Sequence, residues 1–422
     1  MKKYQLKMPH WPKQHVGELR GNPALRTKEL LAKLGSPEKK LPPVIHVGGT
    51  KGKGSTVAFL RYILENAGYK VHCYTSPHLK SFNERIVLAG EEIEDNILFE
   101  ILEKTRIASD EMPLAFFDAT TAAAILAFAT FPADILLMEV GLGGAIDATN
   151  VIENPILTII TTISFDHTEY MGNSLTEIAN FEAGILKPNV PAIISYQHQE
   201  AFEAINKKAT EINSPLYSFG KNWLVRKSKS GMIFQDSYGE VELPLPSLHG
   251  AHQIVNSGNA IAAISALENF DISQTNIISG IMQTKWRGRL EQVRCPFLPK
   301  ESELWFDGGH NAAASEVISH HVMEYWSDKP IYLIFGTTKG KEIAPMLEPF
   351  VEIAKHIYVV SVKSEPRSYK GEEIKQQAES LTEVTVSEDI TDALKDIIKN
   401  SALPFRALIF GSLYLWLEAH NL

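Results

Sequence analysis

The sequence predicts an α/β fold with a mostly parallel sheet, repeated in two successive units. Apolar runs of strand length alternate with longer segments whose apolar residues recur at helical spacing. The runs 134–140 (DILLMEV) and 156–163 (ILTIITTI) are almost continuously apolar, as is typical of strands covered on both faces. A second alternation of strands and helices begins near Cys295, which indicates a second unit.

The element boundaries follow from these periodicities and from the turn residues between them. In the first unit we expect strands 44–47, 70–74, 134–140 and 156–163, and helices 57–67, 120–131 and 250–267. Segment 223–243 alternates apolar and polar residues, which predicts antiparallel hairpins appended to the parallel sheet. In the second unit we expect strands 303–306, 331–335, 357–361 and 406–410, and helices 312–323 and 413–419. Segment 285–299 is the predicted linker, with domains at 1–290 and 291–422.

Composition limits the classes of function. A chain of 422 residues with a net charge of -9 lacks the basic balance typical of nucleic-acid binding, so no nucleic-acid partner is expected. It has no run of about 18 apolar residues, so no membrane partner is expected. The two cysteines are far apart, and the start of the chain lacks the apolar core of a secretory signal. We therefore expect a cytoplasmic protein that binds small molecules and is a monomer.

A glycine-rich segment, HVGGTKGKGST at 46–56, lies where a predicted strand turns into a helix. Its glycines allow backbone N–H groups to approach a polyphosphate, and Lys53 can reach the β- and γ-phosphates. Ser55 or Thr56 would lie near a metal ion. The match to the Walker pattern is imperfect, because Val47 replaces the first glycine and Gly54 follows the lysine. A glycine-rich turn with only a structural use is the alternative interpretation.

Polar residues also follow three predicted strands, where α/β proteins build their sites. Ser76 follows strand 70–74, Glu139 ends the next strand, and Asp166 and His167 follow strand 156–163. Oxygen ligands such as those of Ser76 and Glu139 suit Mg²⁺, whereas His167 suits a softer site. Each residue alone also fits a helix cap, a buried satisfied Glu or a core His. Their recurrence at successive strand ends favours a metal site.

Together these motifs resemble the folylpolyglutamate synthase/dihydrofolate synthase family of the Mur-ligase superfamily. The matching segments are HVGGTKGKGST, YTSPHLKSFNERI, FFDATT, EVGLGGAIDATN, ISFDHTEYMG, HGAHQIVN, WRGRLE, FDGGHN and FGSLY. The resemblance implies a P-loop NTPase-like domain followed by a smaller Rossmann-like α/β domain, with ATP between them. It implies the cofactors ATP and Mg²⁺, and a substrate carboxylate activated as an acyl phosphate that the amino group of L-glutamate attacks.

The resemblance also implies roles for individual residues. The phosphates of ATP would lie on the phosphate loop, at Gly49, Thr50, Lys51, Gly52, Lys53, Gly54 and Ser55. Further contacts to the nucleotide would come from the hinge and the second domain, through Asn256, Arg289, Asp307 and His310. The metals would be held by Ser76, Glu139, His167 and Glu182, and the catalytic residues would be Lys53, His167 and Glu182. A pterin pocket would be lined by Phe116, Phe117, Asp118 and Asp147, where an aromatic ring stacks on a flat heterocycle and a carboxylate accepts its N–H donors.

The chain departs from the family pattern at four places: Lys51 for Asn, Ala145 for Arg, Phe181-Glu182 for Glu-Lys, and Asp118 for Glu. The family lysine is carbamylated and ends in a carboxylate, so we hypothesise that Glu182 supplies the same charge on a shorter arm. A solvent-exposed helix Glu is the alternative. We also hypothesise that the Lys51 charge replaces that of the arginine missing at Ala145.

The function predicted from the sequence is ligation of L-glutamate to dihydropteroate, to a reduced folate, or to both. FFDATT resembles the pocket motif of members that accept dihydropteroate, which favours a bifunctional enzyme. One alternative is a Mur-like ligase with a different acid or amino acid. The other is a non-catalytic paralogue that binds nucleotide or folate.

Overall fold

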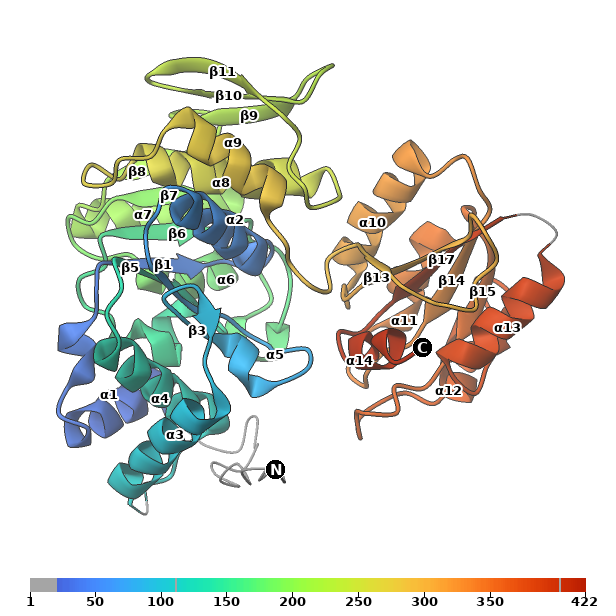
Figure 1. Cartoon of the computed structure of the whole chain (residues 1–422), viewed down its shortest axis with the longest axis horizontal. Coiled ribbons are helices and arrows are strands. Elements are labelled where there is room, and N and C mark those ends of the chain that lie inside the picture. Colours follow the sequence, from blue (N-terminus) through green and yellow to red (C-terminus); the bar gives the residue numbers. More distant parts are fainter. Residues whose placement is uncertain (1–20, 111, 402–403) are drawn as a thin grey trace. The chain divides into compact units, whose positions relative to one another are not determined.

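The computed structural model describes residues 21–110, 112–401 and 404–422. It divides into two compact units (Figure 1). The first unit extends to Ser247 and includes Gln253–Thr284, and the second contains Leu248–His252 and Lys285–Leu422. No helix in the described ranges is long and apolar enough to cross a lipid bilayer.

The first unit is built on a mixed, mostly parallel sheet, which confirms the predicted fold class. Its strands lie in the order β4 (Glu91–Glu92), β3 (Ile86–Leu88), β2 (Val71–Tyr74), β5 (Ile135–Glu139), β1 (Val44–Gly48), β6 (Leu157–Ile160), β7 (Ala192–Ile194) and β8 (Leu216–Ser218). The run from β2 to β8 is parallel, β3 pairs antiparallel with β2, and β4 pairs antiparallel with β3. The carboxyl ends of β2, β5, β1 and β6 are therefore neighbours at one edge.

Helices cover both faces of this sheet. Helices α2 (Lys53–Asn66) and α9 (Gln274–Gln283) lie on one side, and α1 (Pro23–Lys33), α3 (Asp95–Ser109) and α4 (Phe116–Thr130) on the other (Figure 1). The contact between α2 and α9 is close because Gly280 has no side chain: a Cβ there would lie 2.6 Å from Ile63 Cα. This packing holds α2, whose first residue is Lys53.

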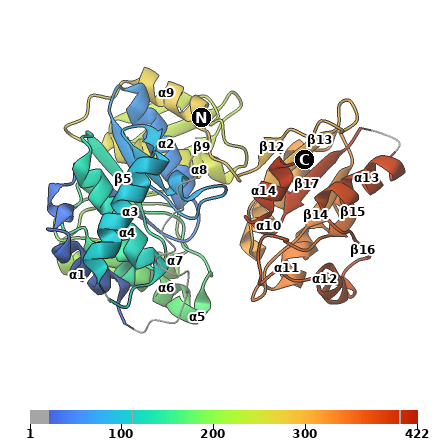
Figure 2. The same ribbon diagram turned by 60° about the horizontal axis from the view of Figure 1, so that its bottom comes forward.

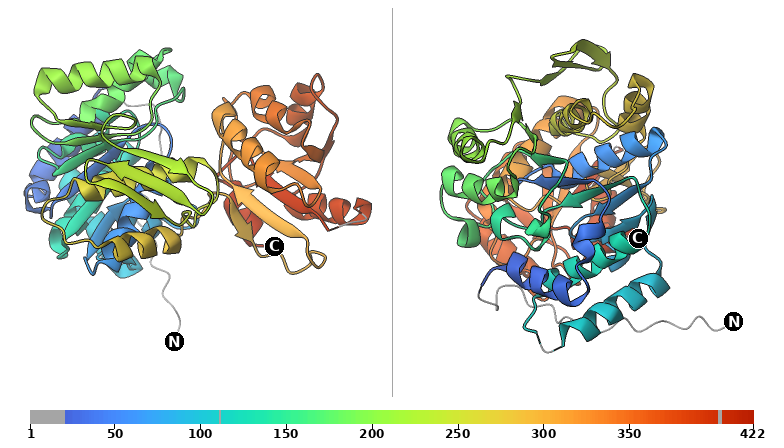
Figure 3. Two further views of the ribbon diagram at one scale, coloured as in Figure 1. Left: turned by 90° about the horizontal axis from the view of Figure 1, so that it is seen from above. Right: turned by 90° about the vertical axis from the view of Figure 1, so that its left-hand side faces the viewer.

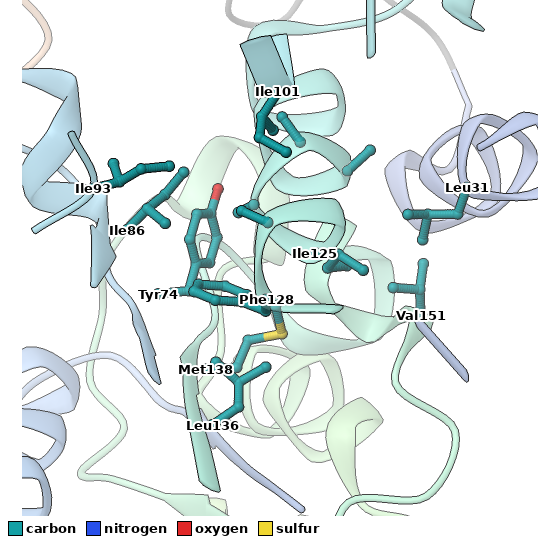
Figure 4. Packing of buried hydrophobic residues seen from close by; sticks show 14 of the residues in the cluster. Leu31, Tyr74, Ile86, Ile93, Ile101, Ile125, Phe128, Leu136, Met138 and Val151 are labelled. Carbon is teal, nitrogen blue, oxygen red and sulfur yellow. The ribbon is translucent and has the colours of Figure 1, made fainter. Parts of the chain in front are cut away.

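A hydrophobic core joins α1, α3 and α4 to the sheet (Figure 4). Phe128 of α4 packs beside Tyr74 of β2, with ring centroids 6.5 Å apart in an edge-to-face arrangement. The buried hydroxyl of Tyr74 shares a 2.9 Å hydrogen bond with Thr121. Burying a side chain such as Phe128 stabilises the fold by about 1.5–3 kcal/mol, so this core fixes α4 against the strand that leads to Ser76.

The remaining helices of the first unit follow the later strands. They are α5 (Thr168–Met171), α6 (Leu175–Glu182), α7 (Gln199–Ile212) and α8 (His252–Ser265). Helix α6 begins at Ser174, which accepts the Glu177 N–H while the Glu177 side chain accepts the Ser174 N–H, so two unpaired donors of the first turn are satisfied. The helix ends at the buried Glu182.

One sequence prediction for this unit is wrong. Strands β9 (Leu224–Lys227), β10 (Met232–Asp236) and β11 (Gly239–Leu243) form an antiparallel sheet of their own and are not appended to the parallel sheet (Figure 3). One face of this sheet is covered, because Trp223, Val225 and Phe234 are buried. Helix α8 packs closely on this face, since a Cβ on its Gly258 would lie 2.5 Å from Val225. The strand pattern predicted the hairpins, but packing on α8 decides where they lie.

The second unit is a smaller α/β unit (Figure 2). Its strand order is β12 (Glu291–Val293), β13 (Glu303–Asp307), β17 (Arg406–Phe410), β14 (Ile331–Phe335), β15 (Ala354–Val359) and β16 (Val384–Val386). Its helices are α10 (Ala312–Tyr325), α11 (Ile343–Leu347), α12 (Gly371–Ala378), α13 (Ile390–Asn400) and α14 (Leu415–His420). Strand β12 pairs antiparallel to β13, so the prediction of a linker over all of 285–299 is wrong.

An ion-pair network ties β13 to β17 where Glu303 pairs with Arg406. Glu303 accepts hydrogen bonds from Arg406 Nε at 2.7 Å and from Trp305 Nε1 at 2.9 Å, and it also pairs with Lys329. Burial alone would raise the pKa of Glu303, but the hydrogen bonds from Arg406, Lys329 and Trp305 outweigh burial and lower the pKa to about 2.

Because the folded-state pKa of Glu303 is depressed, its contribution to stability is present above the unfolded pKa near 4.5 and is lost as pH falls towards about 2. We expect Glu303→Gln to lower the free energy of unfolding by about 1.5–3 kcal/mol at pH 7. The difference from the unmodified chain should shrink on acidification through this range. Urea unfolding followed by tryptophan fluorescence at several pH values measures both effects. The matched control is Glu153→Gln, since the Lys28–Glu153 pair is exposed, and an equal loss in the two variants would contradict the prediction.

Candidate active site at the phosphate loop

The glycine-rich loop connects β1 to α2 and lies against the end of β6. The N–H groups of Thr50 and Lys51 both donate to the carbonyl oxygen of Thr162, at 3.2 and 3.0 Å. Gly49 has φ +113°, and a Cβ there would lie 2.3 Å from Thr161 Oγ1. Only glycine fits at this position, because both the backbone conformation and the space exclude a side chain.

Helix α8 supports the other end of the loop. Gly52 precedes α2 with φ +88°, and a Cβ there would lie 2.2 Å from Asn256 Oδ1. The Asn256 side chain is buried, and its Nδ2 donates to Gln253 Oε1 at 2.9 Å. Asn256 therefore belongs to the first unit rather than the second, and its contact with the nucleotide stays a prediction.

Lys53 and the helix start give the loop its positive character. Lys53 is the first residue of α2, and its Nζ donates to the Gly49 carbonyl oxygen at 2.7 Å. Gly54 and Ser55 follow in the first turn, where Ser55 is buried. Free N–H groups at a helix N-terminus favour anions, so this end of α2 suits a phosphate group.

Glu182 lies inside this site. Its side chain is only 2% exposed, and its Oε2 accepts the Gly49 N–H at 3.0 Å. The alternative of a solvent-exposed helix Glu is wrong. The structure places the carboxylate that replaces the family lysine directly on the phosphate loop.

Ser76 and Glu139, predicted from neighbouring strand ends, lie beside each other, and their role as metal ligands stays a prediction. Ser76 follows β2 and donates its backbone N–H to Glu139 Oε2 at 3.0 Å, and Glu139 is buried at the end of β5. His167 is different: its side chain is 42% exposed, and its Nε2 lies 3.9 Å from Asp166 Oδ1. Across the described residues, no three His, Cys, Asp or Glu side chains converge as a metal cage. The oxygens of Ser76 and Glu139 still fit Mg²⁺, which usually takes one or two carboxylates and completes its shell with water and phosphates.

The predicted pterin residues Phe116, Phe117 and Asp118 occupy the first turn of α4. The ring of Phe116 packs edge-to-face on Phe82, at 5.9 Å between centroids, and Arg85 lies 5.6 Å from the Phe116 ring. The sequence analysis gave no role to Phe82 or Arg85, although both lie in the matched segment YTSPHLKSFNERI.

The carboxylate of Asp118 is already engaged within the protein. Its Oδ2 accepts from Arg26 Nε at 2.6 Å and from the Ala115 N–H at 3.1 Å, which ties α1 to the start of α4. Asp118 as an acceptor for substrate stays a prediction, as do the roles of His167 and of the Lys51–Ala145 pair. Ala145 itself packs on Gly184, where a Cβ would lie 2.3 Å from Ala145 Cα.

Asp147 lies beside Phe117 over Gly141. A Cβ on Gly141 would be 2.5 Å from Phe117 Cζ and 3.1 Å from Asp147 Oδ2. Asp147 accepts backbone N–H groups from Leu142 at 2.8 Å and from Thr149 at 2.9 Å. Burial raises the pKa of Asp147 to about 6, although these hydrogen bonds act in the opposite direction.

The other predicted nucleotide residues lie in the second unit, near the ends of β12 and β13. The buried Asp307 accepts the N–H groups of Leu290 at 2.9 Å and Gly309 at 2.7 Å. Burial raises the pKa of Asp307, and the charge of Arg289 acts to lower it. His310 Nδ1 lies 3.2 Å from the Gly308 carbonyl oxygen. The structure therefore brings Arg289, Asp307 and His310 to one end of the second sheet.

Comparison with known proteins assigns this fold and loop to a class. Residues 47–266 match the family model of the Mur ligase middle domain, and residues 294–421 match the C-terminal domain of dihydrofolate synthetase. The chain thus belongs to the Mur-ligase class.

Individual relatives that match along most of the chain identify the family within this class. A Bacillus subtilis dihydrofolate synthase/folylpolyglutamate synthase is 34% identical over 407 residues, which cover 92% of each chain. The Escherichia coli dihydrofolate synthase/folylpolyglutamate synthase is 30% identical over 80% of this chain and 76% of the relative. The structure of E. coli FolC in complex with DHPP and ADP superposes with a TM-score of 0.87 at 26% identity, covering 96% of this chain and 94% of that one. The chain belongs to the dihydrofolate synthase/folylpolyglutamate synthase family, which confirms the resemblance found in its motifs.

The close approach of Gly52 to Asn256 can be tested by adding one methyl group. We expect Gly52→Ala to lose about 1–2 kcal/mol of stability from its positive φ and about 1–3 kcal/mol more from crowding against Asn256 Oδ1. The matched control is Gly68→Ala, because Gly68 has φ +91° and open space around its Cβ. Urea unfolding followed by circular dichroism measures the difference. Adding Asn256→Ala should recover only the crowding part, and equal losses at Gly52 and Gly68 would refute the contact.

Proposed function

We propose that this chain is an ATP-dependent ligase that joins the amino group of L-glutamate to the carboxylate of dihydropteroate and of reduced folates. The observation that carries the proposal is the 34% identity to a dihydrofolate synthase/folylpolyglutamate synthase over 92% of both chains. The site supports it, because the loop from Gly49 to Ser55 presents backbone N–H groups and Lys53 where a polyphosphate would lie.

The proposed reaction has two steps. An oxygen of the substrate carboxylate attacks the γ-phosphorus of ATP, which forms an acyl phosphate and releases ADP. The amine of glutamate then attacks the acyl carbon, an amide bond forms, and inorganic phosphate leaves with the electrons of the broken C–O bond. Lys53 leaves its bond to the Gly49 carbonyl to contact the transferred phosphoryl group, where its charge offsets the charge that builds up.

The protein groups that would hold Mg²⁺ in this reaction are Ser76 and Glu139, with Glu182 on the phosphate loop. When bound, the ion neutralises phosphate charge and orients the phosphates. Asn256 approaches the loop from α8, and Arg289, Asp307 and His310 are the proposed nucleotide contacts of the second unit. Phe116, Phe117 and Asp147 are the proposed contacts of the heterocycle.

Further properties belong to the same proposal. We propose a cytoplasmic monomer without nucleic-acid or membrane partners. The free thiols of Cys73 and Cys295 and the net charge of -9 support it.

The function is tested by ADP release from the purified chain with ATP, Mg²⁺, dihydropteroate and L-glutamate. We expect sustained turnover only when both acceptor and glutamate are present, and the same with a reduced folate in place of dihydropteroate. Lys53→Ala should lower turnover by about 100-fold or more, because a positioned charge at the transferred phosphoryl group is lost.

The other outcomes distinguish the alternatives. Turnover with a different acid or amino acid would indicate a Mur-like paralogue with another substrate. Nucleotide binding without turnover would indicate a non-catalytic paralogue. Unchanged turnover in Lys53→Ala would contradict the assignment of the loop.

Two substitutions at Glu182 separate the effect of its negative charge from the effect of its hydrogen bond to the phosphate loop. Glu182→Gln keeps an oxygen that can accept the Gly49 N–H but removes the negative charge. If Glu182 helps hold Mg²⁺, Glu182→Gln should raise the Mg²⁺ concentration needed for nucleotide binding by about 10–100-fold while leaving the melting temperature unchanged. Titration of a fluorescent nucleotide analogue with Mg²⁺ measures this without turnover.

Glu182→Ala is the matched comparison, because it removes both the charge and the acceptor for Gly49. It should lose stability as well as Mg²⁺ affinity. An unaltered Mg²⁺ requirement in Glu182→Gln would show that Glu182 only braces the loop.

A further inference from the structure

Three buried side chains form a chain of hydrogen bonds beneath the proposed heterocycle pocket. His46 in the middle of β1 and Thr149 are fully buried, and Asp147 is 3% exposed. His46 Nε2 lies 2.9 Å from Thr149 Oγ1, and Thr149 Oγ1 donates to Asp147 Oδ1. Neither His46 nor Thr149 is among the residues to which the proposed function gives a role.

The direction of these bonds follows from the chemistry of the three groups. An ionised carboxylate only accepts, so the single hydroxyl proton of Thr149 goes to Asp147 Oδ1. The hydroxyl oxygen can then only accept from His46, which fixes the proton of the imidazole on Nε2. Burial lowers the pKa of His46 to about 3, so the ring is neutral, and within the described residues its Nδ1 has no hydrogen-bond partner.

The two oxygens of Asp147 are therefore different. Oδ1 receives both the hydroxyl and the backbone N–H of Thr149. Oδ2 receives the Leu142 N–H and lies over Gly141, where the ring of Phe117 also lies. Oδ2 and the ring of Phe117 therefore flank the same backbone position.

We propose that His46 and Thr149 are positioning residues for substrate selection, which hold Asp147 as an oriented, ionised acceptor for the N–H donors of the heterocycle. This rests on the proposed function, since it assigns the heterocycle to the Phe117–Asp147 pocket. Thr149 saturates Oδ1 and so directs Oδ2 to the substrate. His46 orients the Thr149 hydroxyl, because its Nε2–H donates to the hydroxyl oxygen. That oxygen therefore accepts from His46 and not from another donor.

The central test is Thr149→Val, which removes the hydroxyl but keeps the shape and the backbone N–H. The KM for dihydropteroate should rise about 10-fold or more, the effect of losing one hydrogen bond to a charged group. The KM for ATP and for L-glutamate should stay within about 2-fold, since the phosphate loop is untouched. Thr149→Ser keeps the hydroxyl and should restore the KM for dihydropteroate.

His46 is tested in the same way through its donor. His46→Gln can place an amide N–H near Nε2 and should bind dihydropteroate better than His46→Leu, which has no donor. Melting temperatures check that each variant is folded, and His46→Gln provides the test if Thr149→Val prevents folding.

The outcomes separate this inference from the proposed function. Wild-type turnover with dihydropteroate, together with an unchanged KM in Thr149→Val or an equal rise in the KM for ATP, would overturn the inference alone. A wild-type chain that neither binds nor turns over dihydropteroate would overturn the proposed function and the inference with it. Binding without turnover would overturn the ligase function, and the dissociation constants of the variants would then decide the inference.

Discussion

The candidate site depends on how closely the backbone of the phosphate loop approaches its neighbours. Gly49 lies against Thr161 at the end of β6, and Gly52 lies against Asn256 of α8. Because neither position has room for a Cβ, the loop backbone itself packs against Thr161 and Asn256, and the Thr50 hydroxyl adds hydrogen bonds to the Ser164 backbone. The N-terminus of α2 and the amine of Lys53, which donates to the Gly49 carbonyl oxygen, give the loop its positive character, while Glu182 accepts the Gly49 N–H.

The strand order explains why the other predicted groups lie beside this loop. Placing β1 between β5 and β6, with β2 next to β5, brings the ends of four parallel strands together. The apolar runs of 134–140 and 156–163 predicted two of these strands, and the glycine pattern predicted the loop, because both signals are local. The pairing of β9–β11 as a separate sheet and the pairing of β12 with β13 depend on contacts between distant segments, which the pattern of one segment does not contain.

Side-chain environments were less predictable than strands for the same reason. The sequence left open whether Glu182 lies exposed on a helix or in the site, and the fold buries it against the loop. Asp118 looked like a pocket carboxylate, yet Arg26, 92 residues away, pairs with it. His46 read as one more residue of a buried strand, and only the fold brings it to Thr149.

The charges at this sheet edge lead to one further constraint. Glu139, Asp147 and Glu182 are all buried, and the negative charge of Glu182 acts to raise the pKa of Asp147. A polyphosphate added to the same site brings more negative charge, and like charges in a partly desolvated site repel strongly. Lys53 and the N-terminus of α2 offset part of this negative charge. With Glu182 in the metal site as proposed above, a divalent cation between the carboxylates and the phosphates would offset this repulsion during binding as well as during phosphoryl transfer.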